Sequence, residues 1–372
     1  MYNLRKFLPF IILLLGFSCK EENYSIHKGS SMSKLLNMIE EPWSQTPNFS
    51  DRLHQVEWFD IPNWQRETLE KEALACFKKS LPKLQEQDPK GRWKIIANEI
   101  DKIDENNPEE ILDFFKRFFI PYQLANKDDS LEKARLTSYS EDNFKASFTK
   151  TNYYKWPVYQ IPLDNTEIGK YTRYELYKQG FLEGKEIAFF GNPSDVFRSE
   201  LQGSMGALVG EGPNEVLYHL GHDGGNKKTF KSIWRAVRGD ANPMNDNELN
   251  QYILEDPSRF YSTIDRMNFF KIRDKLIGIL GVELTPKRSL AVNKADFDEL
   301  NLPIGIPVYY SSVDHEDNPD FNRLGFAQDS IAGDTVRINL FYGYGKEATQ
   351  KARQMGDTRT TRVYVLLPKY IQ

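Results

Sequence analysis

The sequence of 372 residues predicts a mainly β fold, built of barrels or a sandwich, with a group of helices toward its N-terminal end. Two observations favour this class. Apolar residues recur at helical spacing in three stretches before residue 121, and after about Leu136 short aromatic and β-branched segments alternate with Gly, Pro, Asn and Asp. Many short strands with few helices are typical of barrels and sandwiches rather than of a parallel α/β sheet. The length favours two domains over one.

Three N-terminal helices are predicted from the periodicity of apolar side chains. Pro62 and Trp64 precede the first, and the third opens on Asn107 and Pro108, which suit a cap and a first helical turn, and stops at Pro121. We interpret these helices as structural. The apolar positions are Leu69, Ala73, Phe77 and Leu81 in the first, Trp93, Ile96, Ile100 and Ile103 in the second, and Ile111, Phe114, Phe115 and Phe118 in the third.

The later part of the chain is predicted to consist of strands with three further helices. The segment YYKWPVYQIP at 153–162 is extended, because its two prolines do not fit a helix interior and most of the rest is aromatic or β-branched. Helices are predicted at 172–179, 246–254 and 346–355. Further strands are predicted in GVELTPKRSLAV, LPIGIPVYY, FAQDSIAGDTVRINLFYG and TRVYVLLP.

Charge and motif content argue against several function classes. A formal net charge of -4 offers no basic field to hold phosphates, so we expect no nucleic-acid partner. His219 and His222 lie near Asp223, but no third ligand has the spacing of a metal site, and a turn between strands is favoured over a zinc centre. GYGKEA at 343–348 could receive an anion, yet it lacks the rest of a phosphate loop. We therefore expect neither a metal nor a cofactor.

The first 19 residues form a predicted signal peptide. Arg5 and Lys6 lead an apolar run, residues 7–17, that is too short to span a membrane comfortably, and LGFSC resembles the lipidation box of bacterial lipoproteins. Lipidation of Cys19 would anchor an exported, periplasm-facing monomer to a bacterial membrane, which we take to be the outer membrane. A secretory peptide cut nearby and an uncleaved anchor are the alternatives. The polar segment 20–47 is predicted to be a tether.

Polar residues within the predicted strands carry a resemblance to a known family. LTSYSEDNFKASFTKTNYYKWPVYQIP, residues 136–162, resembles the opening block of the membrane-bound lytic murein transglycosylase A family, which reads Leu-Thr-Gly-Tyr-Tyr-Glu-Pro and continues into an aromatic-Pro-x-Tyr strand. Later blocks follow in the family's order as far as Lys369. They are YTRYELYKQGFLEGKEIAFFGNPSDVF, LQGSM, KSIWRAVRGD, GVELTPKRSLAVN, RLGFAQDSIAGDTVRINLFYGYG and RVYVLLPK.

The resemblance implies a fold and an activity. The family has a double-psi β-barrel domain, made from the beginning and end of the chain, and an inserted second β domain, with glycan strands bound in the groove between them. We therefore expect 48–142 and 275–372 to form the helical part and the barrel, and 143–274 to form the insert. The family cleaves the bond between N-acetylmuramic acid and N-acetylglucosamine in peptidoglycan without water, closing a 1,6-anhydro ring, and one carboxyl group makes both proton transfers.

The family's terminal barrel carries three aspartates, and only one of them is matched by an aspartate here. The first falls on Asn293, the second on Asp329 and the third, the family's catalytic acid, on Asn339. An amide has no useful acidic proton, and losing a general acid costs about 10²–10⁴-fold in rate. Asp329 is a candidate replacement, because a carboxyl group partly buried in the groove can have a raised pKa. Asp334 would lie roughly 16 Å from residue 339 along an extended strand, on the opposite face.

Further groove contacts are implied by family position. Strand alternation places Arg337, Asn339 and Phe341 on one face, which we expect to line the groove. Each contact also has a structural interpretation, such as a turn for Gly203, a strand-end cap for Ser204 or Thr137, and a hydrogen-bond partner of Asp329 for Arg337. The expected sugar-binding residues are Thr137, Tyr139, Gln202, Gly203, Ser204 and Arg337.

Three functions stay open at this point. The chain can be a working transglycosylase that uses Asp329, or an acid not yet identified, and keeps Asn339 as a sugar contact. It can instead be a peptidoglycan-binding protein that retains the groove and has lost the chemistry. A barrel with an unrelated ligand is the third, and it predicts no affinity for murein. Ser138, Ser140 and Met205 depart from the family blocks, which indicates that the groove's shape differs too.

Overall fold

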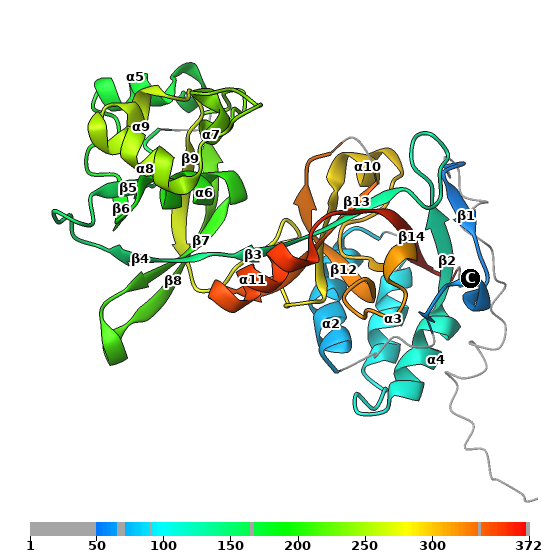
Figure 1. Ribbon diagram of the computed structural model, residues 1–372. Coiled ribbons are helices and arrows are strands. Elements are labelled where there is room, and N and C mark those ends of the chain that lie inside the picture. Colours follow the sequence, from blue (N-terminus) through cyan, green and yellow to red (C-terminus); the bar gives the residue numbers. More distant parts are fainter. Residues whose placement is uncertain (1–49, 65–70, 89–90, 164–166, 334–335, 370–372) are drawn as a thin grey trace, which may run out of the picture. The chain divides into compact units, whose positions relative to one another are not determined.

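Strands β3 (Ala134–Glu141) and β4 (Asn143–Ser147) are nearly consecutive, and they mark the place where the first of two β-sheets gives way to the second. The computed structural model describes residues 50–64, 71–88, 91–163, 167–333 and 336–369 (Figure 1). The predicted signal peptide with Cys19, the tether at 20–47 and Asp334 lie outside these residues.

The first sheet closes into a six-stranded barrel. Its strands follow the order β14, β11, β12, β10, β13 and β3, and β3 pairs again with β14. The pairs β10–β12 and β13–β3 are parallel, and the others are antiparallel. The prediction of a mainly β fold with a barrel and a second β-sheet is therefore confirmed. The bounds are β10 (Ser289–Asn293), β11 (Pro307–Ser312), β12 (Asn322–Ile331), β13 (Arg337–Tyr344) and β14 (Thr358–Pro368), with β1 (Leu53–Gln55) and β2 (Phe119–Leu124) added beside β14.

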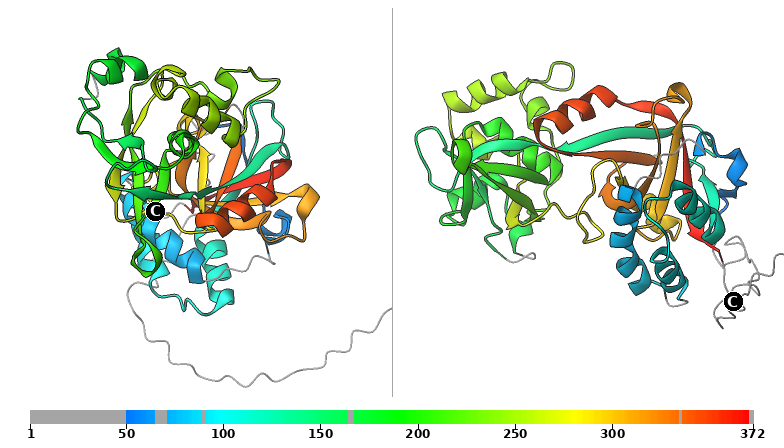
Figure 2. Two further views of the ribbon diagram at one scale, coloured as in Figure 1. Left: turned by 60° about the vertical axis from the view of Figure 1, so that its left-hand side comes forward. Right: turned by 90° about the horizontal axis from the view of Figure 1, so that it is seen from below.

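Three helices, α2 (Lys71–Glu86), α3 (Arg92–Ile100) and α4 (Pro108–Phe118), gather on the barrel (Figures 1 and 2). As predicted, Asn107 caps α4, and its side chain accepts hydrogen bonds from the first free backbone N–H groups of the helix. Phe77 of α2 stacks on Phe326 of β12 with ring centroids 5.2 Å apart. Burying such rings against the barrel is the main stabilising contribution of these helices.

Helix α11 (Gly345–Met355) begins directly after β13 and lies along β3 (Figures 1 and 2). The Ser138 hydroxyl donates a 2.7 Å hydrogen bond to the carbonyl of Ala352, which holds the last turn of α11 against the strand. The predicted helix at 346–355 is confirmed, with its start one residue earlier. Helix α10 (Lys294–Glu299) similarly follows β10.

The second sheet has the order β5, β6, β4, β7, β8 and β9, and its pairs are antiparallel except for β4–β7. The segment predicted to be extended at 153–162 contains β5 (Trp156–Tyr159). The other bounds are β6 (Glu186–Phe190), β7 (Ser204–Val209), β8 (Val216–Gly225) and β9 (Asn268–Arg273).

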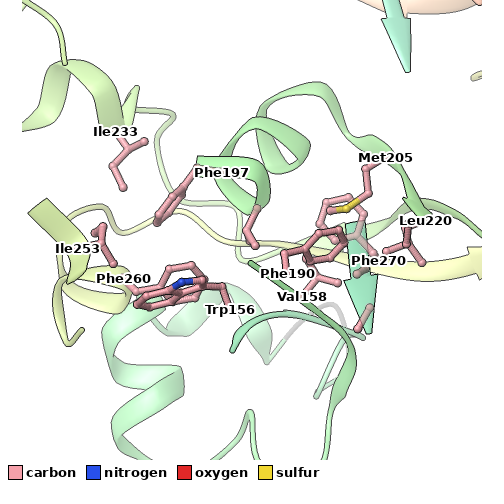
Figure 3. Packing of buried hydrophobic residues seen from close by; sticks show 14 of the residues in the cluster. Trp156, Val158, Phe190, Phe197, Met205, Leu220, Ile233, Ile253, Phe260 and Phe270 are labelled. Atoms are coloured by element: carbon pink, nitrogen blue, oxygen red, sulfur yellow. The ribbon is translucent and has the colours of Figure 1, made fainter. Parts of the chain in front are cut away.

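Among the described residues, helices pack on the second sheet around two hydrophobic clusters, and Figure 3 shows the larger one. Figure 3 shows Trp156 of β5 lying against Phe260, with ring centroids 5.2 Å apart, and Phe197 also contacts Phe260. This larger cluster is separate from the core of the barrel and gives the second sheet its own stabilising centre. The helices are α5 (Arg173–Lys178), α6 (Pro193–Gln202), α7 (Ile233–Ala236), α8 (Asp246–Glu255) and α9 (Arg259–Ser262).

The block KSIWRAVRGD, which resembles a helix of the family, contains α7, but α6, α9 and α10 are not predicted. Helix α6 is the important omission, because Asn192 and Pro193 are a helix start of the kind recognised at Asn107 and Pro108. The helices predicted at 172–179 and 246–254 are confirmed as α5 and α8. Short 3₁₀ turns complete the described chain at Trp58–Asp60, Ile168–Lys170, Gly212–Asn214 and Val313–His315.

Candidate active site

Asp329, Ala291, Asn339 and Thr137 form one row across four adjacent barrel strands. Asp329 of β12 pairs with Ala291 of β10, which pairs with Asn339 of β13, which in turn pairs with Thr137 of β3. Residues paired in this way have side chains on the same face of a sheet. Asp329 and Asn339 are therefore separated by two strand spacings, or about 10 Å between backbones.

Asn339 is enclosed among polar partners, with 8% of its surface exposed. Its Oδ1 accepts a 2.9 Å hydrogen bond from the Thr137 hydroxyl, and no described residue accepts a hydrogen bond from its Nδ2. The predicted alternation of β13 is confirmed, because Arg337, Asn339 and Phe341 pair with alternate residues of β3. The carboxamide can donate a hydrogen bond to a ligand, but it holds no titratable proton.

A cavity of about 440 Å³ lies beside this row. Its walls come from both sheets and from the segment between β9 and β10. Five of the predicted site residues meet there, whereas Thr137, Arg337 and Asn339 do not line it, so their contact with a sugar stays a prediction. The lining residues are Tyr139, Gln202, Gly203, Ser204, Gly221, His222, Arg273, Leu276, Ile277, Gly278, Ile279, Gly281, Asp329 and Ser330.

Asp329 is a carboxyl group in this cavity, held at both oxygens. The Tyr139 hydroxyl donates a 2.8 Å hydrogen bond to Oδ2, and the backbone N–H of Ile279 donates to Oδ1 at 3.3 Å. Burial raises the pKa of Asp329, although the hydrogen bonds from Tyr139 and from the backbone oppose this effect. The protonated form is thus favoured more than in an exposed aspartate, as a proton donor requires.

Arg337 does not contact Asp329, contrary to its structural interpretation in the sequence analysis. Its Nη2 donates to the Thr137 hydroxyl at 3.4 Å and its Nη1 to the carbonyl of Ala332 at 3.5 Å. Burial lowers the pKa of Arg337, with a further contribution from nearby Arg135. Arg337 therefore orders the end of the row at Thr137 and Asn339.

The end of α6 supplies a second wall of the cavity. Gly203 has a φ of 82°, a left-handed conformation that favours glycine and ends the helix, and its carbonyl accepts a hydrogen bond from the backbone N–H of His222. Ser204 then begins β7 opposite Gly221. Gln202 donates to Oδ2 of Asp142 at 3.4 Å. The turn proposed for Gly203 is confirmed, and it brings the Gln-Gly-Ser segment to the cavity.

A buried ion pair anchors that wall. Arg173 of α5 is fully buried, and its guanidinium lies 4.6 Å from the ring of Phe197 and 4.7 Å from that of Phe260. Its Nη1 donates to both carboxylate oxygens of Glu200, at 2.9 and 2.8 Å. Since Glu200 lies two residues before Gln202, this pair fixes the last turn of α6 and the segment that follows it.

Sequence reasoning missed a second carboxyl group, Glu141, at the end of β3. Glu141 is 1% exposed, its Oε1 lies 2.7 Å from Nδ1 of His219, and its Oε2 is buried without a hydrogen-bond partner. Burial raises the pKa of Glu141, and the hydrogen bond to Glu141 raises the pKa of His219. The alternation of Thr137, Tyr139 and Glu141 along β3 was the available signal for this residue.

The described residues hold no group of three or more His, Cys, Asp or Glu side chains arranged to bind a metal ion. His219 and His222 lie in β8, and Asp223 pairs with Lys271. Over the same part of the chain, no helix has the length and apolar character needed to cross a membrane.

Comparison with known proteins identifies the second sheet. Residues 135–270 match the family model described as the MltA specific insert domain, and this segment runs from β3 to β9. This segment of the chain is similar to the insert domain of the MltA family. The barrel strands β10 to β14 follow the matched segment in the sequence, whereas the barrel strand β3 lies at its start. No curated protein matches the chain.

Solved structures share the fold of this chain. MltA from Neisseria gonorrhoeae is 20% identical, with a TM-score of 0.70 over 90% of this chain and 96% of that one. The membrane-bound lytic murein transglycosylase from Agrobacterium tumefaciens is 20% identical, with a TM-score of 0.64 over 85% and 97%. E. coli MltA with bound chitohexaose is 17% identical, with a TM-score of 0.59 over 89% and 98%.

Proposed function

We propose that this chain is a lytic transglycosylase that cleaves the N-acetylmuramic acid to N-acetylglucosamine bond of peptidoglycan and uses Asp329 for proton transfer. The observation that carries the proposal is a carboxyl group of raised pKa, hydrogen-bonded to Tyr139, in a cavity of the MltA fold. The chitohexaose bound by E. coli MltA supports a glycan as the ligand class.

The first step needs an acid. Protonated Asp329 donates its proton to the glycosidic oxygen, the bond from that oxygen to C1 of the muramic sugar breaks, and the departing sugar keeps the proton. Positive charge then develops at C1, next to a carboxylate that has just formed. Hydrogen bonds from Tyr139 and from the backbone N–H of Ile279 stabilise that carboxylate.

The second step needs a base at the same place. The Asp329 carboxylate accepts the proton of the muramic 6-hydroxyl while that oxygen forms a bond to C1, which closes the 1,6-anhydro ring. The carboxyl group returns to its protonated state and no water is consumed. One carboxyl group is sufficient because the nucleophile belongs to the substrate, unlike the water or second carboxylate of ordinary glycosidases.

A second candidate function is supported by Asn339. This residue takes the place of the family's acid in β13, and its Oδ1 already accepts a hydrogen bond from Thr137. Such a row of hydrogen-bonding groups suits sugar binding without proton transfer. The alternative is therefore a peptidoglycan-binding protein that does not cleave its ligand.

An assay on purified sacculi separates the two functions. Full-length protein is incubated with sacculi, and the soluble products are analysed by liquid chromatography and mass spectrometry. Products that end in 1,6-anhydromuramic acid support the transglycosylase. Binding to the sacculi without soluble products supports the binding protein, and neither binding nor products would contradict both.

We also propose that a lipid anchor holds the chain at a membrane. Lipidation of Cys19 would hold it, as a monomer facing the periplasm, on the outer membrane with the segment 20–47 as tether. Metabolic labelling with a palmitate analogue tests this directly. We expect label in the membrane fraction of the wild type and none in Cys19→Ala, and label retained in Cys19→Ala would contradict the anchor.

A further inference from the structure

A cationic side chain, Arg273 at the end of β9, lines the cavity beside the candidate acid. Its Nη2 donates a 3.1 Å hydrogen bond to the carbonyl of His222, which leaves other guanidinium N–H groups available. No described carboxylate lies within ion-pair distance of Arg273. Its neighbour along the strand, Lys271, is different, because it pairs with Asp223 at 2.5 Å.

Gly221 makes room for this guanidinium. A Cβ atom at Gly221 would lie 2.4 Å from Nε of Arg273 and 2.6 Å from its Cδ. Arg273 is paired in register with His219, so its side chain runs diagonally over the neighbouring strand position at Gly221. Only a residue without a side chain permits this path, and both Gly221 and Arg273 belong to the cavity wall.

The other titratable groups of the cavity do not neutralise Arg273. Asp329 is bonded to Tyr139, and burial raises its pKa. Burial lowers the pKa of His222, with nearby Arg266 and Arg273 adding to the effect, so this imidazole favours its neutral form. The wall formed by β8 and β9 thus presents one positive charge to the cavity. A ligand that brings a carboxylate would complete the charge balance there.

We propose that Arg273 binds a carboxylate carried by the 3-O-lactyl branch of the muramic sugar, and so selects peptidoglycan over unbranched N-acetylglucosamine chains. The inference rests on the proposed function, because it takes a glycan strand as the ligand. The carboxylate has two sources, the free lactyl carboxylate of a strand without peptides or the carboxylates of a stem peptide. Both form the paired hydrogen bonds to which a guanidinium is suited.

The test compares three glycans of equal length by calorimetric binding to the full chain. They are a chitooligosaccharide, a peptide-free strand of alternating N-acetylglucosamine and N-acetylmuramic acid, and the same strand with stem peptides. Asp329→Asn is used as the common background so that no ligand is cleaved. We expect at least one muramic strand to bind about 10- to 100-fold more tightly than the chitooligosaccharide, the range of a hydrogen bond to a charged group.

Two variants and one control test whether Arg273 causes the preference for muramic strands. Arg273→Gln should remove it while leaving chitooligosaccharide affinity unchanged. Gly221→Ala should have the same effect without removing any charge, because the new methyl group displaces a flexible side chain rather than backbone. Lys271→Gln is the matched control, since it removes a charge from the same strand but from a residue that already has a carboxylate partner.

The binding results separate a failure of the Arg273 inference from a failure of the proposed function. If Arg273→Gln loses the preference for the peptide-free strand, the ligand of Arg273 is the lactyl carboxylate. If it loses the preference for the peptide-bearing strand, the ligand is a carboxylate of the stem peptide. Equal affinity of the parent protein for all three glycans, or a preference that survives Arg273→Gln, would overturn the inference while leaving the cleavage proposal intact. Binding of none of the three would refute the proposed function itself.

Discussion

The hydroxyl of Tyr139 donates a 2.8 Å hydrogen bond to Oδ2 of Asp329, joining two barrel strands that are not neighbours in the sheet. Tyr139 lies on β3 and Asp329 on β12, with β13 and β10 between them. The contact therefore crosses the face of the barrel on which the row of Asp329, Ala291 and Asn339 lies. It lowers the pKa of Asp329 against the larger effect of burial, and Asp329 is the only acidic side chain among the described residues that line the cavity.

Tyr139→Phe should move the pH dependence of cleavage. The hydrogen bond from Tyr139 lowers the pKa of Asp329 against the opposing effect of burial, so removing it raises that pKa further. Because the first step needs protonated Asp329, activity should persist to higher pH while the maximum rate falls. Initial rates of anhydromuropeptide release between pH 4 and 9 would show this. If the fall in rate at high pH stayed in place or moved to lower pH, the assignment of Asp329 as the proton donor would be contradicted.

Asn339→Asp should increase the rate of cleavage. The substitution restores a carboxyl group at the family's acid position on β13, where Thr137 can still donate a hydrogen bond. General acid catalysis contributes about 10²–10⁴-fold. A chain whose Asp329 already supplies the acid should gain less than this range, whereas a chain without an acid should gain all of it. Asn293→Asp is the control, because it also restores a family aspartate, at the end of β10 where Asn293 donates to the carbonyl of Gly333. A gain equal to that of this control would argue against a role for position 339.

Local patterns in the sequence were sufficient to predict much of the fold. The cap at Asn107, the helix beginning after Thr172 and the alternation of β13 each depend on residues within a few positions of one another. The Tyr139–Asp329 contact spans 190 residues, and the Glu141–His219 contact spans 78. Such pairs arise from barrel closure and from the pairing of β4 with β7 and of β7 with β8, which periodicity does not encode.

Breaking the Arg173–Glu200 pair should destabilise the insert. Removing one partner of a buried ion pair leaves the other charge buried, which costs about 3–5 kcal/mol. We therefore expect Glu200→Gln and Arg173→Met each to lower the free energy of unfolding measured by urea denaturation, by approximately this amount. The double variant should lose less than the sum of the two single variants.

The exposed pair of Arg238 and Glu248 in the same insert is the matched comparison. Exposed pairs contribute about 0–1 kcal/mol, so Arg238→Met should change stability little. Equal losses at both pairs would show that burial around Arg173 is not the source of the effect.

The Glu141–His219 contact should make stability depend on pH. Both pKa values are raised in the folded chain, from ordinary values of 4.5 and 6.5, so both groups favour the fold when they carry a proton. Their contribution is complete below pH 4.5 and is lost as pH rises through the raised values. His219→Gln should flatten the fall in unfolding free energy between pH 5 and 8. If the free energy of unfolding of the variant fell as steeply over this pH range as that of the wild type, the assignment would be contradicted.

The candidate site was predictable only where family position and local geometry coincide. Gln202, Gly203 and Ser204 reach the cavity because a helix end and a strand start place them there. Arg273 and Gly221 gave no sequence signal, since one side chain lies over the other residue only after β8 and β9 pair. Residues that contact each other across paired strands can be identified only from the three-dimensional structure.

The most direct measurement is the yield of anhydromuropeptides from sacculi for the wild type and for Asp329→Asn. The substitution keeps the shape of the side chain and removes its titratable proton. We predict that the wild type releases these products and that Asp329→Asn releases them at least about 10²-fold more slowly while still binding sacculi. Equal rates for the two proteins would show that the proton is transferred by another group.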